Sequence, residues 1–399
     1  MLSLKLKITE NQQQSTNYSR NTNDYWHSGQ PTTSMDKITS LDETFGLPCP
    51  SCGSQLRYSA KEKMIICQHC GYQEEINRSN DQIVEQSLAK AASELQDYIP
   101  ERAGKKVFDC NNCGAKFMVE SDQVNVNCGF CGSKNVNNEA FEHRYIQPIG
   151  LIPFYISREE AEKIFIKWIG KGFFTPSKLK KLADLEHLHG IYIPFWTYDA
   201  HTDSQWSGDA GHYYYVTKTV RQNGKLIKKR IRKTRWKRRS GQLQHFFDDV
   251  LVVASGRLQQ KQANKIMPYR LEEMVNYDPR LMVGWESEVY HIEVDEGYHK
   301  ADITMDNRIR QMCSAQLGGD TQRNLRVSTQ KHSQTFKHIV LPLWICTYNY
   351  NSKVYQFFIN GQTGKVSGKK PVSALKVTLV VLLVMLIIVA IVLITKETK

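Results

Sequence analysis

Two stretches of the chain carry the same pattern of cysteines: CPSCGSQLRYSAKEKMIICQHCG, at Cys49–Gly71, and CNNCGAKFMVESDQVNVNCGFCG, at Cys110–Gly132. Each stretch reads C-x2-C-x14-C-x2-C, and every cysteine of the second lies 61 positions after its counterpart in the first. A repeat of paired cysteines at this spacing indicates a duplicated zinc site. The candidate ligands are Cys49, Cys52, Cys67, Cys70, Cys110, Cys113, Cys128 and Cys131.

A glycine follows the second cysteine of every pair, at positions 53, 71, 114 and 132. A chain that turns tightly around a metal often needs a positive φ there, which glycine adopts without strain. Four thiolates fill a tetrahedral zinc shell and leave no position for water or substrate. We therefore expect two structural Zn²⁺ ions. The alternative is two disulfides in each block, which requires an oxidising compartment.

The most apolar segment, Val377–Ile394, contains seventeen apolar residues, one threonine and no charge. Eighteen helical residues rise about 27 Å, close to the roughly 30 Å hydrocarbon core of a bilayer. A buried helix of this length would normally have a polar face, and this segment has none. We expect a transmembrane helix over residues 377–395 and a tail-anchored, single-pass membrane protein.

Lysines flank the apolar segment unevenly, with three before it, at 369, 370 and 376, and two after it, at 396 and 399. Positive residues favour the cytoplasmic side of a membrane, and the start of the chain has no apolar core long enough for a signal peptide. We therefore expect the large N-terminal part to lie in the cytoplasm, anchored to the inner membrane. A reducing cytoplasm also suits cysteines that bind metal.

Positive charge is concentrated in one segment. The formal net charge is +13, yet residues 218–239 carry twelve Lys or Arg and no acidic residue, so the rest of the chain carries +1. Asn223 and Gly224 form a favoured two-residue turn between segments rich in aromatic and β-branched residues, which predicts a basic hairpin over residues 212–239. Its candidate anion-binding residues are Lys218, Arg221, Lys225, Lys228, Lys229, Arg230, Arg232, Lys233, Arg235, Lys237, Arg238 and Arg239.

Uncompensated charges on both faces of such a hairpin repel one another unless an anionic surface lies near them. Three anionic partners stay open at this point: the phosphates of nucleic acid, the anionic inner leaflet of the membrane, and an acidic protein. A hairpin that is merely solvated is the fourth interpretation.

Residues 139–371 mix helix and strand patterns. Ser157 and Glu160 form a capping box before a helix with an apolar stripe, and Thr175 with Pro176 opens a leucine-rich helix that Gly190 ends. Alternating strand patterns surround these helices, so we expect an α+β fold with a mostly antiparallel sheet. The expected regions are a disordered polar tail (1–44), zinc ribbon 1 (45–76), a helical spacer (77–106), zinc ribbon 2 (107–138), the α+β domain (139–371) and the transmembrane helix (377–395).

Motifs for catalysis are scarce. The sequence contains no G-x-x-x-x-G-K-[ST], no H-E-x-x-H and no G-x-S-x-G. Asp248 and Asp249 could bind a cation or act as acid and base, but local hydrogen bonding at a strand edge is the simpler interpretation. Gly318 and Gly319 could belong to a site, but a helix end explains them more simply. We therefore expect a protein that is not an enzyme.

Several longer motifs carry a family resemblance: GIYIPFWTYDAHT (190–202), HFFDDVLVVAS (245–255), LGGDTQRN (317–324), TFKHIVLPLW (335–344) and FINGQTGKVSGKKP (358–371). With the two cysteine blocks, they make roughly residues 45–371 resemble a bacterial family of membrane-anchored double zinc-ribbon proteins of uncharacterised activity. Members are often labelled primosomal-helicase-like or TFIIB-type zinc ribbons, and some relatives are encoded beside SPFH-domain and phage-shock proteins. The resemblance implies a membrane anchor in envelope stress. The richness of the hairpin in Lys and Arg departs from it.

Three hypotheses for function follow. The first is a non-enzymatic scaffold whose ribbons and α+β domain recruit cytosolic proteins to the inner membrane. The second is a membrane-tethered nucleic-acid-binding protein, associated with replication or transcription, in which Tyr213, Tyr214, Tyr215 or Trp236 stack on bases. The third is an enzyme with a site in the α+β domain that no motif reveals.

Overall fold

The computed structural model describes residues 47–75, 83–90, 96–98, 105–120, 126–128, 130, 133–134, 136–138, 145–176, 188–222, 225–350 and 353–397. The chain divides into the units Met1–Asp42 and Glu43–Lys399, and every described residue belongs to the second unit. The polar tail expected at 1–44 lies outside the described residues. So do residues 177–187, which make up most of the expected leucine-rich helix.

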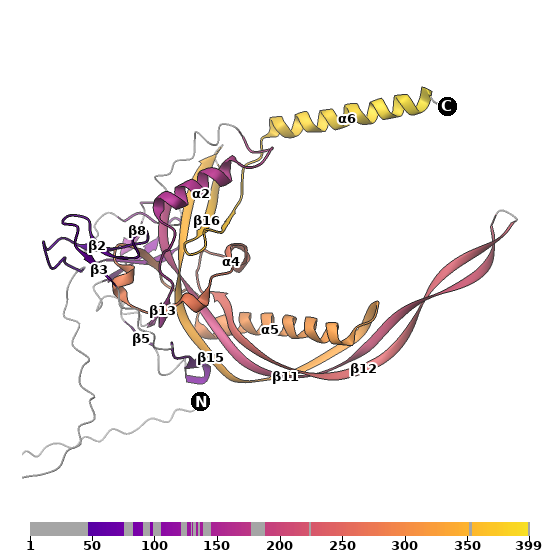
Figure 1. The fold of residues 1–399 in the computed structure, drawn as a ribbon, viewed down its shortest axis with the longest axis horizontal. Coiled ribbons are helices and arrows are strands. Elements are labelled where there is room, and N and C mark those ends of the chain that lie inside the picture. Colours follow the sequence, from indigo (N-terminus) through magenta and orange to yellow (C-terminus); the bar gives the residue numbers. More distant parts are fainter. Residues whose placement is uncertain are drawn as a thin grey trace, which may run out of the picture. The chain divides into compact units, whose positions relative to one another are not determined.

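One large sheet of twelve strands forms the body of the protein (Figure 1). Its strands are β4 (Gln86–Ser87), β6 (Lys105–Cys110), β7 (Lys116–Glu120), β8 (Val136–Asn138), β10 (Gly150–Leu151), β11 (Leu188–Gln222), β12 (Lys225–Val253), β13 (Val275–Asn276), β14 (Glu286–Glu288), β15 (Thr321–Tyr350), β16 (Lys353–Asn360) and β17 (Val366–Gly368). Two pairings are parallel, β10 with β15 and β11 with β14, and the other described pairings of this sheet are antiparallel. The expected α+β class with a mostly antiparallel sheet is confirmed.

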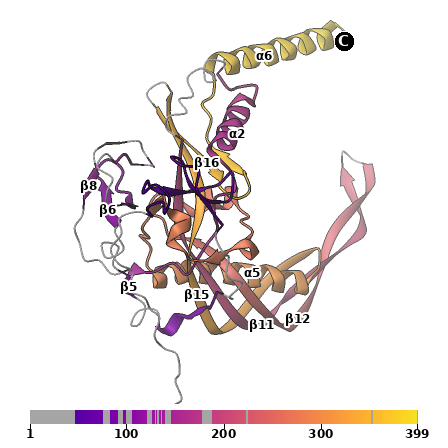
Figure 2. The ribbon, with the colours of Figure 1, turned by 60° about the vertical axis from the view of Figure 1, so that its left-hand side comes forward.

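Three long strands dominate this sheet. β11 pairs with β12 in an antiparallel ladder that ends at Gln222↔Lys225, and β15 pairs with β11 along its other edge. The pairing with β15 stops at Gly211↔Thr321, so β11 and β12 continue alone as a two-stranded hairpin (Figure 2). The predicted turn residues 223–224 lie outside the described residues, but the last pair leaves a loop of the predicted length.

Burial on both sides of the sheet explains the apolar run at the start of β11. Alternate residues of a strand point to opposite faces. Ile191, Ile193 and Phe195 belong to one buried cluster, whereas Tyr192 and Trp196 belong to clusters that do not include them. Both faces of the sheet at this point are therefore covered by core.

The described helices are α2 (Arg158–Gly170), α4 (Gln260–Ile266), α5 (Val294–Leu317) and α6 (Ala374–Glu397), and the described 3-10 turns are η1 (Leu88–Lys90), η4 (Leu271–Glu273) and η5 (Pro279–Met282). The predicted capping box opens α2, because the Glu160 N–H donates to Ser157 Oγ (3.3 Å) and the Ser157 N–H donates to Glu160 Oε2 (2.9 Å). Phe165 of α2 packs on Phe357 of β16, with ring centroids 4.9 Å apart.

Helix α5 lies against β11, β12 and β15. The Tyr198 hydroxyl donates to the Val294 carbonyl (2.6 Å) and fixes its first turn to β11. Gly318 and Gly319, with φ of +69° and +86°, follow its last residue, so their interpretation as a helix end is confirmed. The buried stripe of α5 is Val294, Gly297, Ala301, Met305, Ile309, Cys313 and Leu317.

A helical spacer was expected at 77–106, but the described part of this segment forms short strands and a single 3-10 turn. It contains β4, the single turn η1, β5 (Gln96–Tyr98) and the start of β6. β4 pairs with β15 through Thr335↔Ser87, and β5 pairs with β9 (Tyr145–Ile146). Pairing with strands from distant parts of the chain has replaced the helix that the apolar spacing predicted.

Candidate functional site

The first cysteine block, called the first ribbon (residues 47–75), has a sheet of its own. Its strands are β1 (Leu56–Ser59), β2 (Met64–Cys67) and β3 (Gln73–Glu74). The Gly53 N–H donates to the Cys49 carbonyl (2.8 Å), and the Gly71 N–H donates to the Cys67 carbonyl (2.9 Å). Both glycines have positive φ, +72° and +79°, as the sequence predicts for turns around a metal.

The four sulfur atoms of the first ribbon lie within 4.8 Å of one another. Cys49 Sγ is 3.4 Å from Cys70 Sγ, and Cys52 Sγ is 3.6 Å from Cys67 Sγ. A disulfide would bring two sulfurs to about 2.05 Å, whereas four sulfurs about 2.3 Å from one central ion lie about 3.8 Å apart. These cysteines are free, so the disulfide alternative is wrong for this block and the tetrad fits a metal ion.

Neighbouring groups shift the pKa of two of these thiols, Cys52 and Cys70. Hydrogen bonding from the Ser54 backbone lowers the pKa of Cys52 to about 6. A backbone hydrogen bond from Tyr72 acts in the same direction on Cys70, but the neighbouring sulfur of Cys49 and burial outweigh it, and the pKa of Cys70 is raised to about 12. A metal ion favours the thiolate at every ligand, so binding would release protons from this cluster.

The second cysteine block, called the second ribbon (residues 105–138), repeats this geometry. Cys110, Cys113 and Cys128 converge, with Cys113 Sγ 3.5 Å from Cys128 Sγ, whereas Cys131 lies outside the described residues. The Gly114 N–H donates to the Cys110 carbonyl (2.5 Å), and Gly114 has a φ of +67°. The three described cysteines suit a second metal ion.

The two ribbons attach to the body in different ways. Strand β7 of the second ribbon pairs with β14 through Ser287↔Met118, so this ribbon continues the twelve-stranded sheet. The predicted domain boundary after residue 138 therefore does not separate two sheets. The first ribbon meets the body through side chains and single hydrogen bonds, such as Tyr58 N–H to the Val283 carbonyl and Trp285 Nε1–H to the Tyr58 carbonyl, both 3.3 Å.

The twelve predicted basic residues all lie on β11 or β12. Eleven of their side chains are exposed, and that of Lys225 lies outside the described ones. Arg239 also has a structural contact, because its guanidinium donates to the carbonyl of the last residue of α5 (2.7 Å), where the helix dipole favours a cation. The structure therefore confirms an exposed basic hairpin, with one arginine that also ties its base to α5.

The aromatic residues expected to stack on bases already have cationic partners within the chain. A guanidinium lies over each ring at a distance typical of cation–π contacts. The pairs are Arg230 with Tyr215 (4.3 Å), Arg232 with Tyr213 (4.2 Å), Arg235 with Tyr214 (5.5 Å) and Arg323 with Trp236 (4.1 Å). A base would have to displace an arginine or use the other face of the ring.

The motif LGGDTQRN (317–324) holds the base of the hairpin. The Asp320 carboxylate accepts the Tyr213 N–H (2.7 Å), and Asn324 Nδ2 donates to the Asp209 carboxylate (2.9 Å). These bonds connect the start of β15 to β11 at the point where the two strands separate. The motif is explained by structure, and no ligand is needed to account for it.

Acidic residues gather around one buried lysine at a bulge in the sheet. Lys337 Nζ lies 2.8 Å from Asp249 Oδ1, 3.2 Å from Glu85 Oε1 and 3.5 Å from Asp199 Oδ2. Burial raises the pKa of Asp199 to about 6, and its carboxylate accepts the Asp249 N–H (2.5 Å). Oxygen atoms of Glu85, Asp199 and Asp248 could surround a cation, but Lys337 already supplies the positive charge. The Asp249 side chain thus contacts a lysine 88 positions away and not a neighbour along the chain, so local hydrogen bonding does not describe it.

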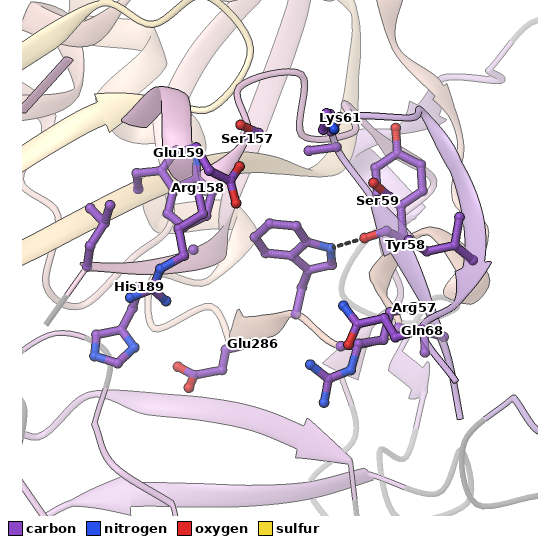
Figure 3. Close-up of a pocket in the computed structure, with 18 of the residues that line it drawn as sticks. Arg57, Tyr58, Ser59, Lys61, Gln68, Ser157, Arg158, Glu159, His189 and Glu286 are labelled. Atoms are coloured by element: carbon purple, nitrogen blue, oxygen red, sulfur yellow. Dashed lines mark hydrogen bonds between the residues drawn. The ribbon is translucent and has the colours of Figure 1, made fainter. Parts of the chain in front are cut away.

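A cavity of about 460 Å³ lies between the first ribbon and the body (Figure 3). Arg57 of β1, Glu159 of α2, His189 of β11 and Glu286 of β14 contribute polar side chains to its lining. Burial raises the pKa of Glu286 to about 7, and Glu286 Oε2 has no hydrogen-bond partner among the described residues. No sequence pattern predicts this cavity, because segments from distant parts of the chain build it. Its one sequence signal is a carboxylate inside an apolar pattern.

Helix α6 is long and apolar enough to cross a membrane. Its segment Ala374–Ile391 has a mean hydropathy of 3.0 and no buried residue. This agrees with the expected span at 377–395.

Comparison with known proteins gives one match of uncharacterised function. The chain is 27% identical over 342 residues to the Bacillus subtilis (strain 168) protein named "Uncharacterized protein YdjG", a similarity that covers 82% of this chain and 91% of that protein. No family model matches the chain, and no solved structure matches it. The similarity thus spans most of both chains.

Proposed function

We propose that this chain is a membrane-anchored, cytoplasm-facing scaffold that recruits proteins to the inner membrane. The observation that carries the proposal is the setting of the first ribbon, a small separate sheet held at the side of a body that also carries an exposed apolar helix. The second ribbon is already accounted for as part of the main sheet. The first ribbon exposes Cys52 and Cys70 and is free to present a surface to a partner protein. The resemblance to proteins encoded beside phage-shock proteins supports a role in envelope stress.

Zn²⁺ is the ion that we assign to both ribbons. Four thiolates complete its tetrahedral shell and leave no open position, so its role is to stabilise the fold. The first ribbon needs this contribution because its own buried core holds only Leu56 and Ile65 beside Cys49 and Cys67 among the described residues.

Anionic lipid of the inner leaflet is the partner that we assign to the basic hairpin. Each Lys or Arg near an anionic membrane surface gains about 1 kcal/mol, so eleven exposed charges bind strongly without a shaped pocket. The cation–π pairs favour this assignment, because the arginines are already stacked on the tyrosines and their outer edges remain free for phosphate.

Photocrosslinking in membranes tests the scaffold. A benzoylphenylalanine at exposed His69 of the first ribbon is compared with one at exposed Glu296 of α5. We expect a cytosolic protein to be crosslinked at 69 and not at 296, and to leave the membrane fraction in the Cys49→Ser variant. Absence of a protein adduct at 69, or a partner that stays at the membrane in Cys49→Ser, would contradict the proposal.

A membrane-tethered nucleic-acid-binding protein is the second candidate. Tyr213, Tyr214 and Tyr215 beside so many cations favour it, because such surfaces bind single strands. The full chain in neutral nanodiscs is titrated with single- and double-stranded DNA across a salt series, beside a variant with Lys228, Lys229, Arg230, Arg232 and Lys233 changed to Gln. Hairpin-dependent DNA binding that survives about 150 mM salt would replace the scaffold with this function.

The proposal includes no catalytic step. The first cysteine tetrad, and the second if Cys131 completes it, would form closed metal shells, and Lys337 already pairs with the carboxylates of Glu85, Asp199 and Asp249. Neither kind of site offers an open coordination position or a free base.

A further inference from the structure

The loop after α2 carries two exposed phenylalanines side by side. Phe173 is 71% exposed and Phe174 is 41% exposed. Their ring centroids lie 5.4 Å apart, with the rings almost perpendicular at 89°. Single exposed apolar residues are ordinary on protein surfaces, whereas contiguous exposed apolar side chains are typical of surfaces that contact a protein, a ligand or a membrane.

Hydrogen bonds tie this loop to the entrance of the apolar helix. The Ser373 N–H donates to the Phe174 carbonyl (2.8 Å), and Lys376 Nζ donates to the Thr175 carbonyl (2.8 Å). Ser373 directly precedes Ala374, the first residue of α6. The backbone of the loop therefore lies beside the first turn of the candidate span.

Lysines surround the same place. Lys370 Nζ donates to the carbonyls of Lys171 and Trp168, at the C-terminal end of α2, and lies 4.3 Å above the Trp168 ring. Burial lowers the pKa of Lys370. Aromatic rings and long-stemmed lysines together are typical of the boundary between lipid and water, where the rings enter the lipid and the ammonium groups stay in water.

We propose that Phe173 and Phe174 enter the lipid beside α6 and form a second membrane contact, which fixes how the cytoplasmic domain sits on the bilayer. The inference rests on the membrane anchoring in the proposed function and adds a contact that the span alone does not supply. The exposed side chains of Val372 (63%) and Leu375 (73%) extend the same apolar surface into the helix. That continuity with the span selects lipid as the occupant, because a protein partner would have to share the surface with the bilayer.

Photocrosslinking to lipid tests the contact. The full chain, with benzoylphenylalanine in place of Phe173, is reconstituted into vesicles of phosphatidylethanolamine and phosphatidylglycerol, irradiated, and analysed for phospholipid adducts. The matched control carries the same group at Ile303 of α5, which is 50% exposed. We expect several-fold more lipid adduct at 173 than at 303. Equal yields, or an adduct with protein at 173, would overturn the inference.

Alkaline extraction of the same vesicles separates this inference from the anchor. A chain that resists extraction but gives no excess lipid adduct at 173 overturns the second contact and leaves the anchor intact. A chain that is extracted overturns the anchor itself. A Phe173→Asp, Phe174→Asp variant provides a further measurement: it should remain in the membrane through α6, while trypsin cleaves after Lys171 several-fold faster. Unchanged cleavage would overturn the contact.

Discussion

The two ribbons share one cysteine pattern but differ in what surrounds it. In the second ribbon, Cys128 and Phe117 are fully buried and belong to the same cluster as the apolar residues of β11. In the first ribbon, Cys49 and Cys67 belong to a small cluster of their own. A duplicated motif has thus become a brace inside the sheet in one copy and an attached module in the other. The ligands alone do not tell these roles apart.

The largest expected difference concerns the ligands themselves. Cys128→Ser should remove the second metal and unfold much of the body, because a structural zinc site contributes about 10–16 kcal/mol of apparent binding free energy. Cys49→Ser, at a ligand of similar burial, should empty the first site and leave the main unfolding transition in place. Thermal unfolding followed by circular dichroism, with metal content by mass spectrometry, measures both. Equal loss of the main transition in the two variants would mean that the ribbons are equivalent.

Truncating one buried side chain in each ribbon tests the same contrast without touching a ligand. Phe117→Ala should lower the stability of the whole body by about 3–5 kcal/mol, because Phe117 fills the core beneath the sheet. Ile65→Ala removes an equally buried residue but should unfold the first ribbon alone. Hydrogen exchange resolved by peptide distinguishes local from global opening. Fast exchange of β11 in Ile65→Ala would contradict a separate module.

The carboxyl of Glu286 reports how tightly the first ribbon closes the cavity. Its pKa in the folded state is about 7, above the 4.5 of an exposed glutamate. Its contribution to the free energy of unfolding is therefore fully present below about pH 4.5, where the carboxyl is protonated in both states. That contribution is lost as the pH rises through 7, because ionisation favours the unfolded state. Gln does not titrate. The free energy of unfolding of Glu286→Gln, relative to that of the wild type, should therefore rise by about 3 kcal/mol between pH 4.5 and pH 8. Urea unfolding at both pH values measures this gain.

The same comparison in the Cys49→Ser background is the control. Water should reach Glu286 once the first ribbon opens, so the gain should shrink there. An unchanged gain would show that the ribbon does not keep the cavity dry.

The smallest effect is expected at the rim between the first ribbon and the body. Glu74→Gln breaks the exposed ion pair with Arg280 (3.2 Å), which should change stability by about 1 kcal/mol or less. The wild type and the variant should have nearly the same urea midpoint. A larger loss would mean that the rim, and not the packing of Tyr58 and Trp285, holds the ribbon in place.

Local signals in the sequence predicted the features that depend on neighbours along the chain. The capping box at Ser157 and Glu160, the helix end at Gly318 and the hairpin between Gln222 and Lys225 are each decided within a few residues. The first cysteine tetrad belongs to this group, because two short turns bring its ligands together. Such features need no knowledge of the rest of the fold.

Features that depend on distant partners were missed. Met118 lies opposite Ser287, and Ser87 lies opposite Thr335. The local sequence around these residues does not predict which strands pair. The second ribbon was therefore expected to stand alone, and the spacer was expected to be a helix. The cavity at Glu286 was missed for the same reason, since the carboxyl becomes buried only after several distant segments have packed together.

Beyond Gly211 and Thr321 the hairpin has only two strands, so β11 and β12 each present an edge that no other described strand covers. Open edges of this kind are templates on which a second copy can add as a further strand, and lysine is the residue that proteins use to prevent it. We therefore expect the basic residues also to oppose edge-to-edge pairing between copies of the chain. A variant in which these residues are neutralised should therefore assemble edge to edge. Loss of lipid or DNA binding in that variant can be attributed to the missing charges only if the variant is still monomeric.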